Sequence, residues 1–185
     1  MKITLELVRD KWGACPEYTA DRLAALYPVP RNAAEVLTLT DGPWAEVPAA
    51  DRLCTVLRKG VLSNRVLRLS ACDCAERALN RERDAGREPH PYYWNAVAVA
   101  KQFALGNATA QEMRDAAYDA ATANAAFAAN AAAAHAPHAA ATTHADAAFS
   151  AFSAFSDDAD ADYPDYASER RTQVDRLLTI IAENS

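Results

Sequence analysis

The amino-acid sequence predicts an all-α fold, a single-domain bundle of about six or seven helices with a central alanine-rich helical pair. Alanine, the strongest helix former, supplies 22 of the 42 residues from Arg114 to Phe155. Elsewhere, apolar residues recur at helical spacing, and residues that suit helix ends flank these stretches. Prolines and glycines separate the stretches, so we expect one helix after another.

The start of the chain predicts short helices. Thr4 suits the cap of a helix over 5–11, although the alternating apolar residues at 3, 5 and 7 also allow a short strand. Pro16 suits the first position of a second helix, which Pro28 stops.

The pattern is weakest over residues 31–47, where 33–39 has room for one or two helical turns. We therefore expect one domain over residues 1–185, with an irregular N-terminal helical part at 1–47 and a helical core at 48–185.

Helix ends are clearer in the core. Ser63 suits the cap of a helix that stops before Gly86, and a helix from Pro91 ends at Gly106. Residues 109–112, Thr-Ala-Gln-Glu, form a capping box, in which the hydroxyl and the carboxylate each bind a free backbone N–H. The last helix, from about Tyr166 to Glu183, places apolar residues on one face, at Val174, Leu177, Leu178 and Ile181.

Composition excludes a membrane span and points to a reducing compartment. No run of about 18 apolar residues lacks polar interruptions. Four cysteines occur in a chain whose first residues do not resemble an export signal, so we expect free thiols and a cytoplasmic location. The net charge is −6, and residues 91–185 hold 5 basic against 12 acidic side chains. We therefore expect no membrane partner.

An acidic segment before the last helix is a candidate partner-binding surface. Its five aspartates are Asp157, Asp158, Asp160, Asp162 and Asp165. Together with Glu169, three of them match the carboxylate spacing of an EF-hand loop, but Tyr163 stands where that loop needs glycine. A solvated acidic linker is the alternative interpretation.

Three histidines, His135, His138 and His144, are candidate metal ligands because His-x-x-His is a known metal spacing. Pro137 lies between the first two, and no cysteine is close in sequence. A core or helix-end role is the simpler interpretation, so we expect no bound metal and no cofactor.

The segment around Asp73 predicts a structural ion-pair network of Asp73, Glu76 and Arg77. Asp73 and Arg77 are four residues apart, and Glu76 lies beside Asp73 on a partly apolar helix face. An acid pair for proton transfer is the alternative. Cys15 and Cys54 have no recognisable base partner for a nucleophilic role.

Several stretches carry a resemblance to a known group. They are Thr4-Leu5-Glu6, Cys15-Pro16-Glu17, Asp73 to Leu79, the alanine-rich helices, and the closing helix from Glu169 to Leu178. In these the chain resembles alanine-rich helical proteins of phages, prophages and bacteria of unknown function, including immunity (Imm-5-like) proteins. The resemblance implies a setting of mobile elements and conflict between bacteria, and it brings no active site.

These observations lead to a functional hypothesis. We expect a non-enzymatic inhibitor or immunity-type protein of phage or mobile-element origin that blocks a bacterial defence or toxin protein. Its partner would be a bacterial host protein or protein complex. The alternative is a helical protein that binds a small molecule, a nucleotide or a metal, in a pocket between the alanine-rich helices. The arginines from Arg65 to Arg87 suit phosphate contacts, but overall acidity argues against nucleic acid. Homo-oligomer formation stays open.

Overall fold

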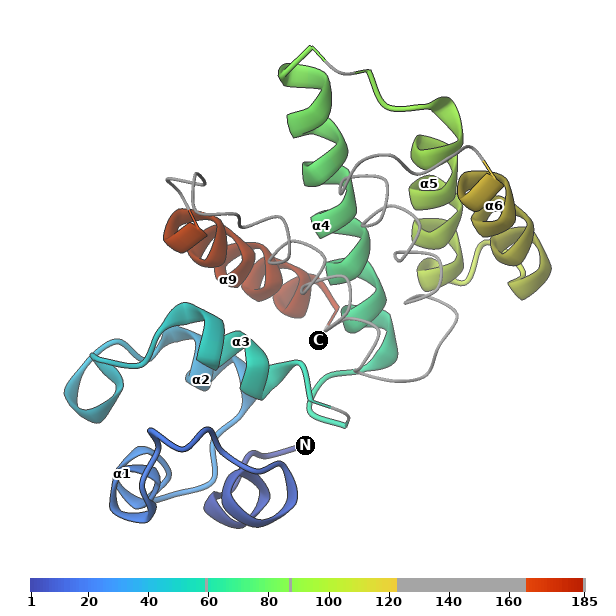
Figure 1. Cartoon of the computed structure of the whole chain (residues 1–185). Helices are drawn as coiled ribbons and strands as arrows, with labels where there is room; N and C mark the ends of the chain where they lie inside the picture. Colours follow the sequence, from blue (N-terminus) through green and yellow to red (C-terminus); the bar gives the residue numbers. More distant parts are fainter. Residues whose placement is uncertain (59, 87, 123–165, 185) are drawn as a thin grey trace. The chain divides into compact units, whose positions relative to one another are not determined.

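The computed structural model describes residues 1–58, 60–86, 88–122 and 166–184 (Figure 1). These ranges are mostly helical and contain seven α-helices, a short π-helix and a 3-10 turn. No β-strand occurs within them, although Ile3 and Arg31 form an isolated antiparallel bridge. The all-α prediction is confirmed. None of the helices in these ranges combines the length and the apolar character that crossing a membrane requires.

The chain divides into two compact units, Met1–Leu62 and Ser63–Ser185. The helix α3 (Ala49–Val56), which we expected in the helical core of 48–185, belongs to the first unit and packs against α2 (Ala33–Thr38). The single domain stays a prediction.

The first unit consists of short helices. In chain order they are η1 (Leu7–Lys11), α1 (Ala20–Leu26), α2, η2 (Gly42–Trp44) and α3. Helices of this length are marginal in isolation, so their stability must come from packing. Their buried apolar side chains include Val36 and Val56, both fully buried, and Leu23, Leu26 and Leu53.

Helix α1 corrects one prediction. We expected this helix to begin at Pro16, but it begins at Ala20. The Thr19 hydroxyl accepts a hydrogen bond from the backbone N–H of Arg22 (3.3 Å) and caps the first turn. The preceding residues form a turn instead, in which the Tyr18 N–H donates to the Cys15 carbonyl (2.9 Å). A side-chain cap thus determines where the helix starts, and the proline does not.

The first residues of the chain combine a strand-like pairing with the start of a helix. Ile3 exchanges both backbone hydrogen bonds with Arg31 (2.7 and 2.9 Å), while helical backbone begins at Leu5. Both a helix and a strand were possible from the sequence here, and the segment contains a strand-like bridge followed by a helix.

Helix α2 begins in the weakly patterned region of residues 31–47. Asn32 and Glu35 form a full capping box for it (2.8 and 2.6 Å), which was not predicted from the sequence.

The second unit contains longer helices: α4 (Asn64–Asp84), α5 (Pro91–Leu105), α6 (Ala110–Thr122) and α9 (Tyr166–Glu183). Helix α4 packs against α5 and α9, and α5 packs against α6 (Figure 1). The predicted helix ends are confirmed. Ser63 accepts from the Val66 N–H (3.3 Å), Gly106 adopts φ +84°, and Glu112 binds the Thr109 N–H (2.7 Å).

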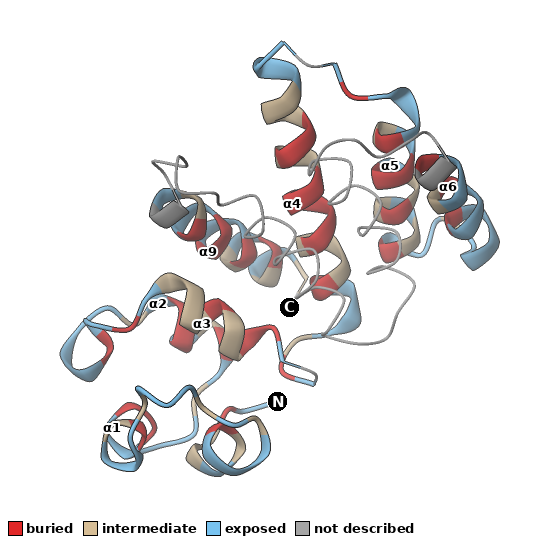
Figure 2. Cartoon of the chain, viewed as in Figure 1, coloured by how far each residue is buried: buried red, intermediate tan, exposed pale blue. Residues whose placement is uncertain are grey.

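Small side chains dominate the core of the second unit. Figure 2 shows buried residues along α4 and α5, where Ala75, Ala96 and Ala100 are fully buried. Leu79, Tyr93 and Met113 are the largest buried members of the same cluster. Alanine buries little area, but it allows helix axes to approach closely, so these helices pack through backbone proximity around a few large anchors.

The last helix is where the sequence placed it. Val174 and Leu177 are buried as predicted, whereas Leu178 and Ile181 are half-buried and Gln173 and Ile180 are buried. The buried face of the helix is therefore turned towards the residues that precede the predicted ones. Most of the predicted central alanine-rich pair lies outside the described residues, which resume at 166.

Candidate functional site

Two of the predicted sites lie outside the described residues. They are the acidic segment (Asp157, Asp158, Asp160, Asp162 and Asp165) and the histidine group (His135, His138 and His144). No cluster of metal-ligating side chains occurs in the part of the chain that the structure describes. The predicted ion-pair network, in contrast, lies fully within it.

Asp73 is the centre of the ion-pair network. Its side chain on α4 is only 9% exposed. Oδ2 accepts from Arg77 Nε one helical turn later (3.0 Å), and Oδ1 accepts from Nε and Nη2 of Arg176 on α9 (2.8 and 2.6 Å). A carboxylate with three guanidinium donors is well compensated for its burial.

Glu169 on α9 extends this network. Arg77 Nη1 and Arg81 Nη2 from α4 both donate to its carboxylate, the latter at 2.9 Å. Gln173 adds a hydrogen bond from its amide (3.0 Å). The sequence analysis missed Arg81, Glu169 and Arg176, because their pairing depends on how α9 lies against α4. The signal it could have used is the match of charges on the two helices.

Glu76 is not part of this group. Lys101 Nζ on α5 donates to both of its carboxylate oxygens (2.6 Å each), and the Glu76 side chain is 34% exposed. Because Asp73 and Glu169 bind arginines at both oxygens and Glu76 binds a lysine, these carboxylates hold helices together. The geometry favours the structural interpretation over acid–base chemistry.

Two thiols lie close to the network on α4. Cys72 and Cys74 are both buried. Burial raises the pKa of Cys72 to about 12 and that of Cys74 to about 11. They therefore stay protonated at neutral pH and do not have the character of nucleophiles.

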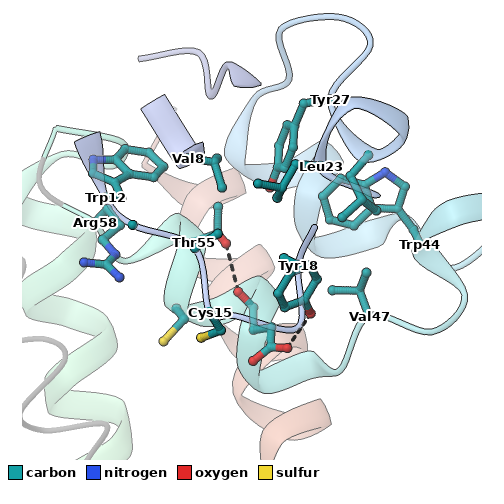
Figure 3. A pocket seen from close by; sticks show the side chains of 15 residues that line it. Val8, Trp12, Cys15, Tyr18, Leu23, Tyr27, Trp44, Val47, Thr55 and Arg58 are labelled. Carbon is teal, nitrogen blue, oxygen red and sulfur yellow. Dashed lines mark hydrogen bonds between the residues drawn. The ribbon is translucent and has the colours of Figure 1, made fainter. Parts of the chain in front are cut away.

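A pocket of about 90 Å³ lies within the first unit (Figure 3). All four aromatic residues between positions 1 and 62 line it. These residues are Trp12, Tyr18, Tyr27 and Trp44. Aliphatic side chains, among them Val8, Leu23 and Val47, complete the apolar wall. A concave, mostly apolar site with aromatic side chains and a few polar groups is the usual form of a small-molecule pocket.

The aromatic wall is held in place by its own contacts. The rings of Tyr27 and Trp44 meet edge to face, with centroids 5.3 Å apart and planes at 79°. Both side chains are buried. The indole N–H of Trp44 has no hydrogen-bond acceptor among the described residues. Tyr18 carries the Arg22 guanidinium 4.7 Å from its ring centre.

Helix α3 supplies most of the polar lining. Cys54 and Thr55 lie about one turn after Asp51 on the same face of the helix, and Arg58 follows just beyond its end. The Tyr18 hydroxyl donates a hydrogen bond to Asp51 Oδ2, shown in Figure 3. Thr55 donates its own hydroxyl proton to the Asp51 carbonyl (2.9 Å). The hydrogen bond from Tyr18 holds the Asp51 carboxylate in one orientation.

Protonation states in the pocket follow from burial. Burial, and then the hydrogen bond to Asp51, raises the pKa of Tyr18 well above its ordinary value. Burial likewise raises the pKa of Tyr27 to about 12. Both phenols are therefore neutral at pH 7. Asp51 is the acidic and Arg58 the basic side chain among the lining residues.

No sequence pattern pointed to this pocket, which is lined in part by Cys15 and Cys54. The predicted pocket between the alanine-rich helices falls mostly outside the described residues and stays a prediction. The sequence feature that could have indicated a pocket is the presence of four aromatic residues among these short helices. No protein-family model, no curated protein and no solved structure matches this chain.

Proposed function

We propose that this chain is a binding protein that takes up a small molecule in the aromatic pocket of its first unit. The observation that supports the proposal is the composition of the wall. Every aromatic residue of that unit faces one cavity, beside a carboxylate that Tyr18 holds in place. Aromatic rings that served only as core filler would be packed without a cavity between them.

The polar groups of the wall support recognition over simple storage of an apolar compound. Asp51, Thr55 and the two thiols lie among apolar surfaces, and such isolated polar groups fix the orientation of a ligand. Small-molecule binding is the class that the sequence analysis gave as its alternative, here at a different place in the chain.

Tryptophan fluorescence tests the proposal directly. The chain has three tryptophans, and Trp12 and Trp44 line the pocket, whereas Trp94 is on α5 in the second unit. In a Trp94→Phe background, the emission reports on the pocket alone. A library of fragments with up to about ten heavy atoms should yield compounds that change this emission and raise the melting temperature of the full chain.

Filling the pocket provides the control. Ala14 lines the cavity, so Ala14→Leu should abolish the fluorescence response and the thermal shift. Ala25→Leu makes the same change at an exposed position of α1 and should leave both intact. A response that survives in the Ala14→Leu variant, or a library without any binder, would reject the proposal.

A second proposal retains the inhibitor or immunity-type function. The described surface feature that favours it is Tyr118 on α6, whose side chain is 71% exposed. It lies one turn from the exposed Asp115 on a polar helix face. Exposed tyrosines are frequent anchors of protein interfaces. The bacterial partner and the origin in a mobile element rest on the sequence resemblance alone.

Partner capture tests this second proposal. The full chain should retain one dominant complex from a bacterial lysate, and Tyr118→Ala should lose that complex. Tyr92→Ala removes another exposed tyrosine, at the start of α5, and should retain it. If both variants behave like the original chain, the α6 face is not the binding surface.

A further inference from the structure

We propose, building on the ligand pocket of the first unit, that its ligand is a small organic cation with an alkylated ammonium group. Three features of the pocket lead to this class: a fixed carboxylate with a free oxygen, a wall of aromatic faces, and a size that suits a head group.

The carboxylate of Asp51 is prepared to receive positive charge. Its Oδ2 accepts from the Tyr18 hydroxyl, while Oδ1 has no hydrogen-bond donor among the described residues. An ionised carboxylate only accepts hydrogen bonds, and it attracts a cation most strongly where solvent is limited. An anionic ligand would be repelled by the same group.

The aromatic wall suits a cation that cannot donate hydrogen bonds. The faces of tryptophan and tyrosine rings carry negative electrostatic potential and bind ammonium groups within about 6 Å of the ring centre. The first unit already contains one such contact, because the Arg22 guanidinium lies 4.7 Å from the centre of the Tyr18 ring. Trp12, Tyr27 and Trp44 surround the remaining space.

The volume sets the size of the group that enters. The cavity of about 90 Å³ is smaller than the roughly 150 Å³ that accommodate benzene in an engineered protein cavity. By the same ratio, a head group of about four heavy atoms is expected to enter, with the remainder of the ligand at the mouth.

The positive charge of Arg58 opposes the binding of a cation, so a substitution of this residue tests the proposal. Its exposed side chain lines the pocket just beyond the end of α3. A guanidinium at the mouth weakens cation binding, and solvent screens the effect. A ligand that carried a carboxylate would gain from the same residue, so the sign of an Arg58 substitution separates a simple ammonium compound from a zwitterion.

The experiment compares choline with its neutral carbon analogue, in which a tert-butyl group replaces the trimethylammonium group. The two have the same shape and differ in charge. Binding to the full chain is measured by titration calorimetry and by the fluorescence of the Trp94→Phe background. We expect choline to bind at least about tenfold more tightly than the neutral analogue.

Variants assign the effect to Asp51. Asp51→Asn should reduce choline binding to the level of the neutral analogue, with circular dichroism to verify folding. Asp21→Asn removes the same charge at an exposed position of α1 outside the pocket lining, and should not change binding. Arg58→Gln should strengthen choline binding by about two- to fivefold.

The outcomes separate this inference from the proposal on which it rests. Equal binding of choline and its neutral analogue, or full choline affinity in Asp51→Asn, would show that the pocket does not select a cation. The pocket would still be a binding site. Weaker choline binding in Arg58→Gln would also overturn it. If neither compound binds and the fragment library yields no binder, the proposed function itself fails.

Discussion

Asp73 on α4 accepts two hydrogen bonds at Oδ1 from Arg176 on α9, although 103 residues separate them in the chain. The same carboxylate binds Arg77 at its other oxygen. The exposure of the partners differs, since the Asp73 side chain is 9% and that of Arg176 is 53% exposed. This asymmetry predicts unequal effects when either partner is removed.

Asp73→Asn should lower the free energy of unfolding by about 2–3 kcal/mol, because it removes one of the two counter-charges of the largely buried Arg77 guanidinium. Arg176→Gln should cost about 0–1 kcal/mol, since an exposed partner is replaced by water. Urea denaturation followed by circular dichroism measures both. An equal cost for the two variants would contradict the structural role assigned to the buried carboxylate.

Glu76→Gln should change stability by less than about 1 kcal/mol. Its carboxylate pairs with Lys101, and both side chains are at least one third exposed. The variant is the matched control for Asp73→Asn, because each removes one acid from α4. A loss as large as that of the Asp73 variant would place Glu76 in the buried network after all.

The thiols should differ in reactivity. At about pH 7.5, the exposed Cys15 should react with iodoacetamide in the folded protein, whereas Cys72 and Cys74 should react only after unfolding. Burial both blocks access and keeps these two thiols protonated. Mass spectrometry of peptides after timed labelling measures the order. Early labelling of Cys72 would mean that α4 and α5 open readily.

Stability should fall at alkaline pH. Burial raises the pKa of Cys72 to about 12 and of Cys74 to about 11 from the ordinary 9.0, so the unfolded chain loses these protons first. The stabilisation is complete below pH 9 and is lost as the pH rises from 9 towards 12. Urea midpoints across this range measure the decline. Cys74→Ala should have a smaller slope than the original chain, and an unchanged slope would refute the assignment.

The capping box at α6 should contribute measurably. Thr109→Ala removes the acceptor for the Glu112 N–H (3.2 Å) and should cost about 1 kcal/mol of stability. Thr172→Ala is its control, because the hydroxyl of that exposed threonine only donates to a carbonyl within α9. Its effect should stay within about 0.5 kcal/mol. Thermal unfolding of both variants provides the comparison.

Local signals predicted the second unit well. Ser63, Gly106 and the Thr109–Glu112 pair end or begin helices where the sequence placed them, because the groups that satisfy a helix end are close in the chain. The start of α1 was misplaced because Pro16 suits a first turn, but Thr19 supplies the cap. Both residues suit a helix start, and the hydrogen bond from the Arg22 N–H to the Thr19 hydroxyl decides between them.

The sequence by itself determined the helical class, most helix ends and the Asp73–Arg77 contact, all of which depend on neighbours within one or two helical turns. Only the tertiary structure decided that Glu76 binds Lys101, that Glu169 joins Arg77 and Arg81, and that four dispersed aromatic residues surround one cavity. Such groups meet through the packing of separate helices. Side-chain volume and charge across the whole unit govern that packing, and no local pattern encodes it.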